Sequence, residues 1–417
     1  MRFAADLHLH SRYSSAVSPA MTLENIALWA QRKGVDLLGT GDCLQLNWLR
    51  ELESGLIPAE PGFFALRPEL EKSVWAKLPQ HLHRPLRFVL STEVSCAPPP
   101  KREIEGIHYL IYFPSFESAH AFRERVAPHG DLSEGRPSLN LHSLTLLEMV
   151  KEHHEDCHLA PAHIMNPWFS ALGTIGGVFS LQELFDDKTN LLLAIETGLT
   201  STPPMCRRIP SLDRLALFSC SDAHSLDNIG RECTLLDIEP SYHALFAALQ
   251  SGAPNRVLET LKFPLVHTRY FLNWCSACKE PFDATLCPKC RKALVEGSRD
   301  RLKRLTTRPH VESVENAPPF RELLPLAHLI AQRTDKKPES DTVKRLVQQL
   351  LEAVGHERYI LTEASDAEID AIVPQISRSI SEQREGRSNF SNPRRSQDAS
   401  AVKQTLLELG SFDYPGA

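Results

Sequence analysis

The sequence lacks the marks of a membrane or secreted protein. No run of about 18 or more apolar residues, as a bilayer-crossing helix needs, occurs among its 417 residues. Its first residues also show no basic segment followed by an apolar one, which a secretion signal requires. These absences exclude a bilayer-spanning helix, and they predict a cytoplasmic protein that makes no contact with a membrane.

An excess of positive charge is also missing. Lys and Arg number 46 against 52 Asp and Glu, which gives a formal net charge of -6. This balance excludes a protein coated with basic residues for nucleic acid. One stretch differs, because residues 289–308 hold eight basic residues and two acidic ones. A local basic stripe is typical of a surface that contacts phosphates, although a solvated helix face is an equally good interpretation.

The ten cysteines do not form the regular pattern of a disulfide framework. Six are scattered, whereas Cys275, Cys278, Cys287 and Cys290 follow the spacing C-x2-C-x8-C-x2-C. Two such knuckles suit a zinc ion held by four thiolates. Since four thiolates leave no open position on the ion, we predict a structural zinc that folds a segment too small for a core of its own.

Apolar and amphipathic segments alternate through about residue 255. Such alternation indicates βα units around a largely parallel sheet. Polar residues of the kind that bind metals follow the strand-like runs, and only a closed barrel brings all those ends around one pocket, so we predict a seven-stranded α/β barrel. The predicted strands are residues 3–8, 35–40, 87–92, 107–113, 158–161, 191–195 and 215–220, with helical patterns between them such as 23–33, 144–153, 181–185 and 242–250.

These polar residues form a candidate metal cluster. His8 and His10 are one residue apart at the end of the first run, so an extended backbone directs both imidazoles to one side, and Asp222 and His224 repeat the pattern. Five imidazoles and three carboxylates are too many for one tetrahedral zinc and suit two or three cations of Zn²⁺, Mn²⁺ or Mg²⁺. The full set is His8, His10, Asp42, Glu93, His108, His163, Asp222 and His224.

Clusters of this kind hydrolyse phosphate esters, because a bound cation lowers the pKa of water to about 7 and others neutralise the phosphate. We predict catalytic roles for Glu93, Asp222 and His224. Glu93 is a candidate bridge between two cations, and Asp222 a candidate to bind a metal, orient the attacking water, or both. Taken alone, a histidine such as His108 is more often a packing residue than a ligand.

The rest of the chain has a different character. Amphipathic spacing over residues 320–331, 342–354 and 366–373 predicts a helical bundle, and polar composition from 381 to 400 predicts a flexible tail. The predicted division is a catalytic barrel at 1–258, a four-cysteine zinc segment at 259–300, a DNA-binding bundle at 301–380 and the tail at 381–417. The tail is also a candidate contact for a sliding clamp.

Several motifs together resemble known families. His8-Leu-His10, Thr40-Gly-Asp42, Glu93, Pro161-Ala-His163 and Ser221-Asp-Ala-His224 are similar to those of the PHP (polymerase and histidinol phosphatase) domain, a distorted (β/α)7 barrel with a trinuclear metal site. Most of the chain also resembles the endonuclease Q family. The residues that carry this second resemblance are Asp6 to Ser14, Gly39 to Asp42, Gly135 to Pro137, Pro167 to Phe169, Ile195 to Leu199, Pro203 to Met205, Ser221 to His224, Gly230 to Glu232, the zinc knuckles, Pro318 to Phe320 and Leu324 to Ala327.

The resemblance implies a metal-dependent DNA repair endonuclease. Endonuclease Q hydrolyses the phosphodiester on the 5′ side of a deaminated base (uracil, hypoxanthine or xanthine) or of an abasic site, so the implied partner is DNA with such a lesion. The target nucleotide would have to leave the duplex, at a cost of a few kcal/mol. Candidate contacts to DNA or to the lesion are Trp168, Phe169, Arg136 and Arg231. Packing of Trp168 and Phe169 against the barrel is an equally good interpretation.

One departure from the family concerns Cys43 to Trp48, where endonuclease Q usually has another histidine before the tryptophan. This difference leaves open whether one metal position is filled. Two other functions also remain open: a PHP phosphoesterase that acts on small phosphate monoesters, and a non-catalytic DNA-binding scaffold. The first gives no role to the zinc knuckles and the bundle, and the second gives none to the candidate ligands.

Overall fold

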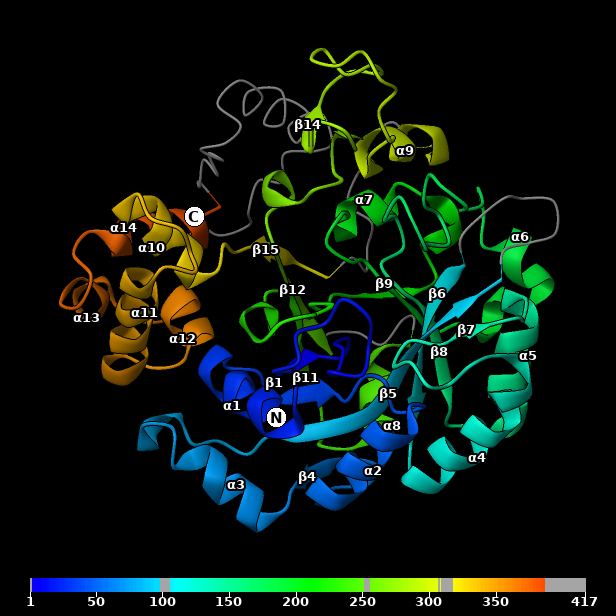
Figure 1. Ribbon diagram of the computed structural model, residues 1–417, viewed down its shortest axis with the longest axis horizontal. Coiled ribbons are helices and arrows are strands. Elements are labelled where there is room, and N and C mark those ends of the chain that lie inside the picture. The colour runs from blue at the N-terminus through cyan, green and yellow to red at the C-terminus, as the bar shows by residue number, and fades with distance from the viewer. Residues whose placement is uncertain (1, 98–105, 251–255, 307, 309–317, 387–417) are drawn as a thin grey trace.

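The computed structural model describes residues 2–97, 106–250, 256–306, 308 and 318–386, and strands occupy its middle with helices around them (Figure 1). Hydrogen-bonded ladders join β1, β2, β5, β6 and β8 in that order, and β9 pairs with β10. Single backbone hydrogen bonds close these strands into a ring, from Ile164 N to Glu196 O and from His10 N to Ala223 O. The ring strands are Arg2–Asp6, Leu37–Gly39, Arg87–Cys96, Ile107–Phe113, His158–Pro161, Ala194–Glu196 and Ala216–Phe218.

The barrel predicted from the sequence is therefore confirmed. Each of its seven predicted strands overlaps a strand of the ring. The prediction succeeds because strands buried on both faces, such as β5 and β6, are continuous apolar runs in the sequence. Small and branched side chains such as Leu7, Val89 and Leu110 fill the interior, and α8 (Tyr242–Ala248) closes its lower end with Leu245.

One strand runs against the others. β6 pairs antiparallel with both β5 and β8, with Ser95 opposite His108 in the ladder. His108 is thus near the beginning of its strand, and the prediction that each candidate ligand follows a strand is wrong at this position. It is also wrong at Glu93, which lies within β5 because that strand continues to Cys96. The reversal still brings His108 to the mouth of the barrel, since an antiparallel strand begins where its neighbour ends.

Helices pack around the outside of the ring. α1 illustrates why they form where they do: the Thr22 side chain accepts a hydrogen bond from Asn25 N at its start, and Gly34, with φ of 81°, ends it. The other helices of this part are α2 (Leu46–Gly55), α3 (Pro68–Trp75), α4 (Phe116–Val126), α5 (Ser143–His153), α6 (Gln182–Phe185) and α7 (Pro203–Arg207), after α1 at Leu23–Lys33. No described helix is long and apolar enough to cross a membrane.

The sheet continues beyond the ring on the side of β1. β11 (Cys233–Asp237) pairs with β1, β12 (Val257–Lys262) with β11, and β15 (Phe320–Glu322) with β12. The predicted boundary at residue 258 therefore falls inside a strand. Shorter strands pair around the end and side of β5, namely β3 (Leu56–Pro58), β4 (Phe64–Leu66) and β7 (Ser138–Leu139).

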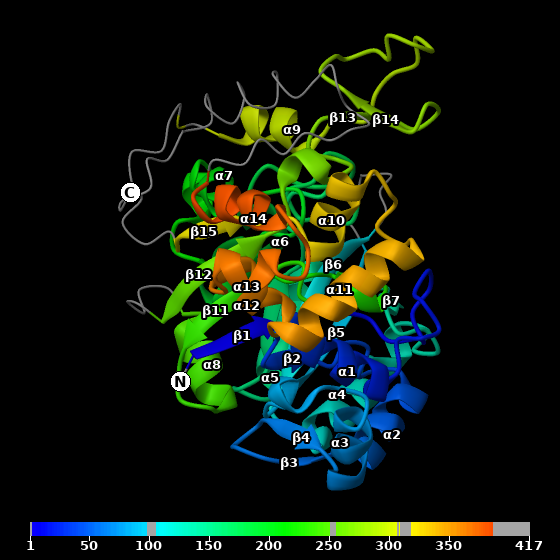
Figure 2. The same ribbon diagram turned by 90° about the vertical axis from the view of Figure 1, so that its left-hand side faces the viewer.

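The C-terminal part consists of a small four-cysteine segment and a helical bundle. β13 (Asn273–Cys275) and β14 (Glu280–Phe282) form a hairpin that precedes α9 (Ser298–Leu305). The bundle lies beside α1, as Figure 2 shows in a view in which the bundle faces the reader. Its helices are α10 (Leu326–Thr334), α11 (Asp341–Ala353), α12 (Glu357–Thr362), α13 (Asp366–Asp370) and α14 (Ile376–Arg384). Most of the predicted tail, including its clamp contact, lies outside the described residues.

Candidate metal centre

Two triads of candidate ligands lie at the mouth of the barrel. His8 and His10, just after β1, face Asp222, which follows β10; Glu93 of β5 faces His108 of β6 and His163, which follows β8. Within each triad, the potential ligand atoms lie within 4.8 Å of one another. Six of the eight predicted ligands, from positions 8 to 222, are thus brought together by the closed ring.

Glu93 connects the two triads. Its Oε1 is 3.0 Å from His108 Nδ1 and 3.1 Å from His163 Nε2, while its Oε2 is 3.3 Å from His10 Nε2. His10 Nε2 is also 3.3 Å from Asp222 Oδ1. A carboxylate with one oxygen toward each group has the geometry of a bridge between two cations.

Four buried side-chain atoms of the centre make no hydrogen bond, although carboxylate oxygens or ring nitrogens of the other triad members lie nearby: His8 Nε2, His10 Nε2, His108 Nδ1 and Asp222 Oδ1. Buried polar atoms normally have a partner, because desolvation is otherwise uncompensated. All four are atom types that bind divalent cations. The donor set therefore fits a metal cluster better than an ordinary polar core.

Two further carboxylates hold the far sides of the histidines. Asp42 Oδ1 lies 3.0 Å from His10 Nδ1, and Glu196 Oε2 lies 3.0 Å from His8 Nδ1. A carboxylate that accepts the Nδ1 proton fixes the tautomer in which Nε2 is free to bind a metal. The structure thus places Asp42, a predicted ligand, behind His10. Its other oxygen accepts from Ser11 N and Ser14 Oγ, at 2.7 and 2.9 Å.

His224 lies at the rim, outside both triads. Its ring centroid is 4.6 Å from that of His10, and its Nδ1 donates to the backbone oxygen of Asp222 at 3.0 Å. The side chain is 31% exposed, against 0% for His10. A solvent-facing ring beside a buried cluster is placed to meet a substrate.

Three residues of the centre have backbone strain in common. Asp42, His163 and Asp222 have φ values of 50°, 29° and 47°, in the left-handed region that non-glycine residues rarely adopt. Close packing holds one of them there, since a Cβ at Gly198 would be 2.4 Å from His163 Cβ. Strain of this kind concentrates at functional sites.

Burial and charge shift the pKa values of the cluster in opposite directions. Burial disfavours the imidazolium of His8, but Glu196, Asp222 and Glu93 outweigh it and raise the pKa well above the ordinary value. Burial instead lowers the pKa of His108 to about 4, despite Glu93. The carboxylates around His8 therefore favour a positive charge at this place.

The four cysteines form a second, separate group. Cys275 Sγ and Cys290 Sγ are 3.5 Å apart, and Cys278 Sγ and Cys287 Sγ are 3.7 Å apart. Zn–S bonds of about 2.3 Å in a tetrahedron give edges of nearly this length. Backbone N–H groups of Cys278 and Cys290 also donate to the first sulfur of each knuckle. The arrangement fits the predicted zinc.

Three of the four predicted DNA contacts lie against the centre. Phe169 stacks on the His108 ring with centroids 4.6 Å apart, and Arg231 donates to Ser221 O at 2.9 Å. Arg136 Nη1 lies 3.4 Å from Glu93 Oε2. Trp168 is half-buried and packs edge-on against Tyr270, at 4.7 Å between centroids.

Part of the basic stripe at residues 289–308 is buried in the structure. Arg299 and Arg301 are each only 2% exposed. Arg299 pairs with Asp283 and Asp300, and Arg301 donates to Leu172 O and Val178 O. These two side chains hold the fold together, so the surface charge of residues 289–308 is smaller than the sequence suggests.

Sequence reasoning gave no role to Glu196. It ends β9, as Glu93 lies on β5, and the rule that selected the other carboxylates after apolar runs would have selected it too. The predicted strand ended at 195, one residue short, so this carboxylate was not recognised as part of the site.

Comparisons with known proteins fit this picture. A family model described as the MJ0043 C-terminal domain matches residues 325–387. The uncharacterized protein YqxK of Bacillus subtilis is 26% identical over 392 residues, which cover 89% of this chain and 91% of the relative. The uncharacterized protein MJ0043 of Methanocaldococcus jannaschii is 27% identical over 164 residues, 39% of this chain and 16% of that protein.

Two solved structures resemble the whole fold. The lesion-specific endonuclease PfuEndoQ of Pyrococcus furiosus is 29% identical with a TM-score of 0.79, over 93% of this chain and 91% of that one. An endonuclease Q in complex with a 27-mer duplex, with an abasic lesion at its active site, gives the same identity and TM-score over 93% and 92%. The resemblance to endonuclease Q predicted from the motifs is thus confirmed.

Proposed function

We propose, from this likeness to endonuclease Q, that the protein is a metal-dependent DNA repair endonuclease. It hydrolyses the phosphodiester 5′ to a deaminated base (uracil, hypoxanthine or xanthine) or to an abasic site. The observation that carries the proposal is the joint presence of an endonuclease Q fold over 93% of the chain and two buried ligand triads at the barrel mouth. The abasic duplex bound by the solved relative supports the same class of substrate.

The residues present suit two divalent cations, which when bound supply hydroxide at neutral pH and neutralise the phosphate. His8, His10 and Asp222 would hold one, and His108 and His163 the other, with Glu93 shared. Zn²⁺ and Mn²⁺ accept this mixture of imidazole and carboxylate, and Mg²⁺ suits it less. The group of four cysteines would hold a structural zinc.

We infer two cations in this cluster rather than three. The oxygens of Asp42 already accept hydrogen bonds from Ser11, Ser14 and His10. The backbone of Gly135 also covers Asp42, since a Cβ there would be 2.5 Å from Asp42 Oδ2. Both oxygens of Asp42 are therefore engaged where a third ion would lie.

The side chains around the triads have separate tasks. Asp222, 24% exposed, orients the attacking water toward the phosphorus. Arg136, 28% exposed and 3.4 Å from Glu93, reaches a phosphate oxygen of the bound strand. His224, whose Nδ1 donates to the backbone of Asp222, presents Nε2 at the rim and accepts the proton that the attacking water loses. Trp168 lies in the loop that follows His163 and stacks on the nucleotide that leaves the duplex.

A cleavage assay tests the proposal. Purified full-length protein with Mn²⁺ is incubated with end-labelled duplexes that carry one uracil, one hypoxanthine, one abasic site or no lesion, and in parallel with a chromogenic phosphate monoester. We expect a nick 5′ to each lesion and none in the unmodified duplex. Turnover of the monoester alone would instead identify a small-molecule phosphoesterase, and DNA binding without turnover a scaffold.

The variant Asp222→Asn addresses the role of the centre. It removes one negative charge and a candidate cation ligand, so we expect cleavage to fall by about 100-fold or more while affinity for lesion DNA changes only a few-fold. Asp227→Asn is the matched control, because Asp227 is exposed and lies only five positions away. Equal cleavage by Asp222→Asn and wild type would show that the assignment is wrong.

A further inference from the structure

A fully buried ion pair lies outside both groups of candidate ligands. Lys262, at the end of β12, and Glu232, just before β11, are each 0% exposed and are bonded to each other. Lys262 Nζ also donates to Thr197 Oγ1 at 2.9 Å and to Gly198 O at 2.6 Å. All three ammonium protons therefore have acceptors.

Stability alone does not explain this pair. Removing two charges from water costs several kcal/mol for each ion, and well-packed apolar residues in their place are often as stable or more so. A buried pair with such well-defined partners is better explained by what it holds in position. The partners of Lys262 are two residues of one turn, Thr197 and Gly198.

That turn lies directly behind the metal centre. It follows Glu196, which accepts from His8 Nδ1 at 3.0 Å and from His163 N at 2.8 Å, and so contacts a member of each triad. Gly198 packs against His163, whose Cβ leaves no room for a side chain there. The bonds from Lys262 thus fix the backbone on which Glu196 and the His163 contact depend.

The other half of the pair is connected to the neighbouring turn. Arg231, next to Glu232 in the chain, donates to Ser221 O at 2.9 Å and so holds the backbone just before Asp222. Two consecutive residues, Arg231 and Glu232, therefore brace the turns that follow β10 and β9. The second brace is completed only by Lys262, which belongs to the strand that leads into the four-cysteine segment.

We propose that Lys262 is a positioning residue of the metal centre, contributed from beyond the barrel. It holds the turn at Thr197 and Gly198 so that Glu196 presents His8, and His163 keeps its place opposite Glu93. The inference rests on the proposed function only in assuming that the triads bind cations. It adds a residue that touches neither cation nor DNA but sets the affinity of the cluster.

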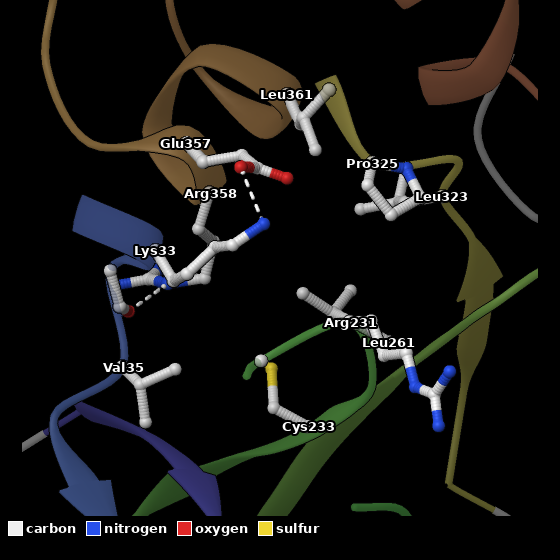
Figure 3. A pocket seen from close by; sticks show the side chains of 12 residues that line it. Lys33, Val35, Arg231, Cys233, Leu261, Leu323, Pro325, Glu357, Arg358 and Leu361 are labelled. Atoms are coloured by element: carbon white, nitrogen blue, oxygen red, sulfur yellow. Dashed lines mark hydrogen bonds and ion pairs between the residues drawn. The ribbon is translucent and has the colours of Figure 1, made fainter. Parts of the chain in front are cut away.

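The molecule contains a matched control for this role. Lys33 and Glu357 form a second buried Lys–Glu pair, with Nζ 2.8 Å from Oε2 and exposures of 7% and 10%. Figure 3 shows this pair on the wall of a small cavity between α1, β12 and α12, with Arg231 and Leu261 on the opposite side. It joins the barrel to the bundle, and Lys33 Nζ bonds to Glu357 rather than to Thr197 or Gly198, so we expect its loss to weaken the fold but to leave the turn held by Lys262 in place.

The test compares Lys262→Met with Lys33→Met in the full chain. Mn²⁺ is the probe, because thiolate sites favour zinc and the Mn²⁺ titration therefore reports the imidazole and carboxylate cluster. Free Mn²⁺ is followed by electron paramagnetic resonance, and thermal unfolding is measured for each variant. We expect Mn²⁺ affinity to fall about 10-fold or more in Lys262→Met and less than 2-fold in Lys33→Met, although both unfold at lower temperature.

A milder variant covers the case in which Lys262→Met does not fold. Thr197→Val keeps the shape of the side chain and removes one acceptor of Lys262, so a smaller loss of Mn²⁺ affinity is expected. Wild-type affinity in a folded Lys262→Met or, failing that, in Thr197→Val would overturn the inference alone. If the wild-type protein binds no Mn²⁺, Zn²⁺ or Mg²⁺ outside the four-cysteine group, the proposed function fails and this inference with it.

Discussion

At the scale of single residues, the carboxylates behind the centre are as important for metal binding as those that face it. Glu93 and Asp222 point toward the triads, whereas Asp42 and Glu196 each accept the far proton of a histidine. The two kinds differ in the ring nitrogen that they face, since Glu93 and Asp222 lie near Nε2 of His8 and His10, and Asp42 and Glu196 lie near Nδ1. This difference decides which carboxylates bind a cation and which only hold the imidazoles that do.

Glu196→Gln should separate these roles. The substitution keeps the size of the side chain but weakens the bond to His8 Nδ1, so we expect Mn²⁺ affinity to fall about 10- to 100-fold with little loss of stability. The measurement is a Mn²⁺ titration of the purified variant. Glu259→Gln, at a carboxylate paired with Arg321 far from the mouth, should bind as wild type does. Equal losses in both variants would contradict the role given to Glu196.

At the scale of elements, sequence periodicity predicted the ring strands and half of the α-helices, and it did not predict strand direction or the depth of side chains. The predicted helices correspond to α1, α5, α6, α8, α10, α11 and α13, whereas α2, α3, α4, α7, α9, α12 and α14 were not predicted, and the start of the predicted helix 320–331 is the strand β15. The apolar pattern of a buried strand does not depend on the direction of the strand, so residues 107–113 could not show that β6 is antiparallel. In the same way, Asp42 and Glu93 both follow or end apolar runs, and only the packing of Ser11 and Ser14 around Asp42 separates them. These distinctions arise from contacts between distant segments, which local patterns do not contain.

Helix α12 should make stability sensitive to pH. Burial and the guanidinium groups of Arg84 and Arg358 lower the pKa of His356 from 6.5 to about 3. The unfolded chain takes up this proton below about pH 6.5 and the folded one does not until about pH 3. Stability from this group is therefore complete above pH 6.5 and falls by about 1.4 kcal/mol for each pH unit below it.

Denaturant unfolding of wild type and His356→Asn between pH 7 and 4 measures this effect. The variant retains an N-cap side chain for α12 but not the buried imidazole, so its stability should depend less steeply on pH. A slope that stays the same in His356→Asn would disprove the assignment.

The four-cysteine segment should depend on its zinc. The hairpin of β13 and β14 is too short for a core, so Cys287→Ser should remove one zinc per chain and open residues 273–295 to trypsin, for example after Lys279 and Arg291. Metal analysis and peptide mapping give the two readouts. Cys206→Ser, at a buried cysteine outside this group, is expected to retain the zinc. Unchanged zinc in Cys287→Ser would show that the four thiolates do not bind it together.

At the scale of the whole molecule, the barrel depends on a strand that lies outside its ring, β12. β12 pairs along β11 and carries Lys262, so a chain that stops at residue 258 loses most of a strand and leaves Glu232 buried without its partner. We expect the fragment 1–258 to aggregate and to bind no Mn²⁺. A fragment 1–306, which keeps β12 and the four-cysteine segment, should retain Mn²⁺ binding. Similar behaviour of the two fragments would argue that the barrel is self-sufficient.

The reversed strand also sets an order of assembly. Glu93 and His108 lie on one hairpin, fifteen positions apart, whereas His8 meets Asp222 only across more than two hundred positions. Contacts between near neighbours in the chain form sooner than those between its distant parts. We therefore expect Glu93 and His108 to meet early in folding, and His163, which is 70 positions from Glu93, to join them later. His8 and Asp222 are expected to meet last. In a refolding time course, the time at which Mn²⁺ binds would therefore report when the ring of strands closes.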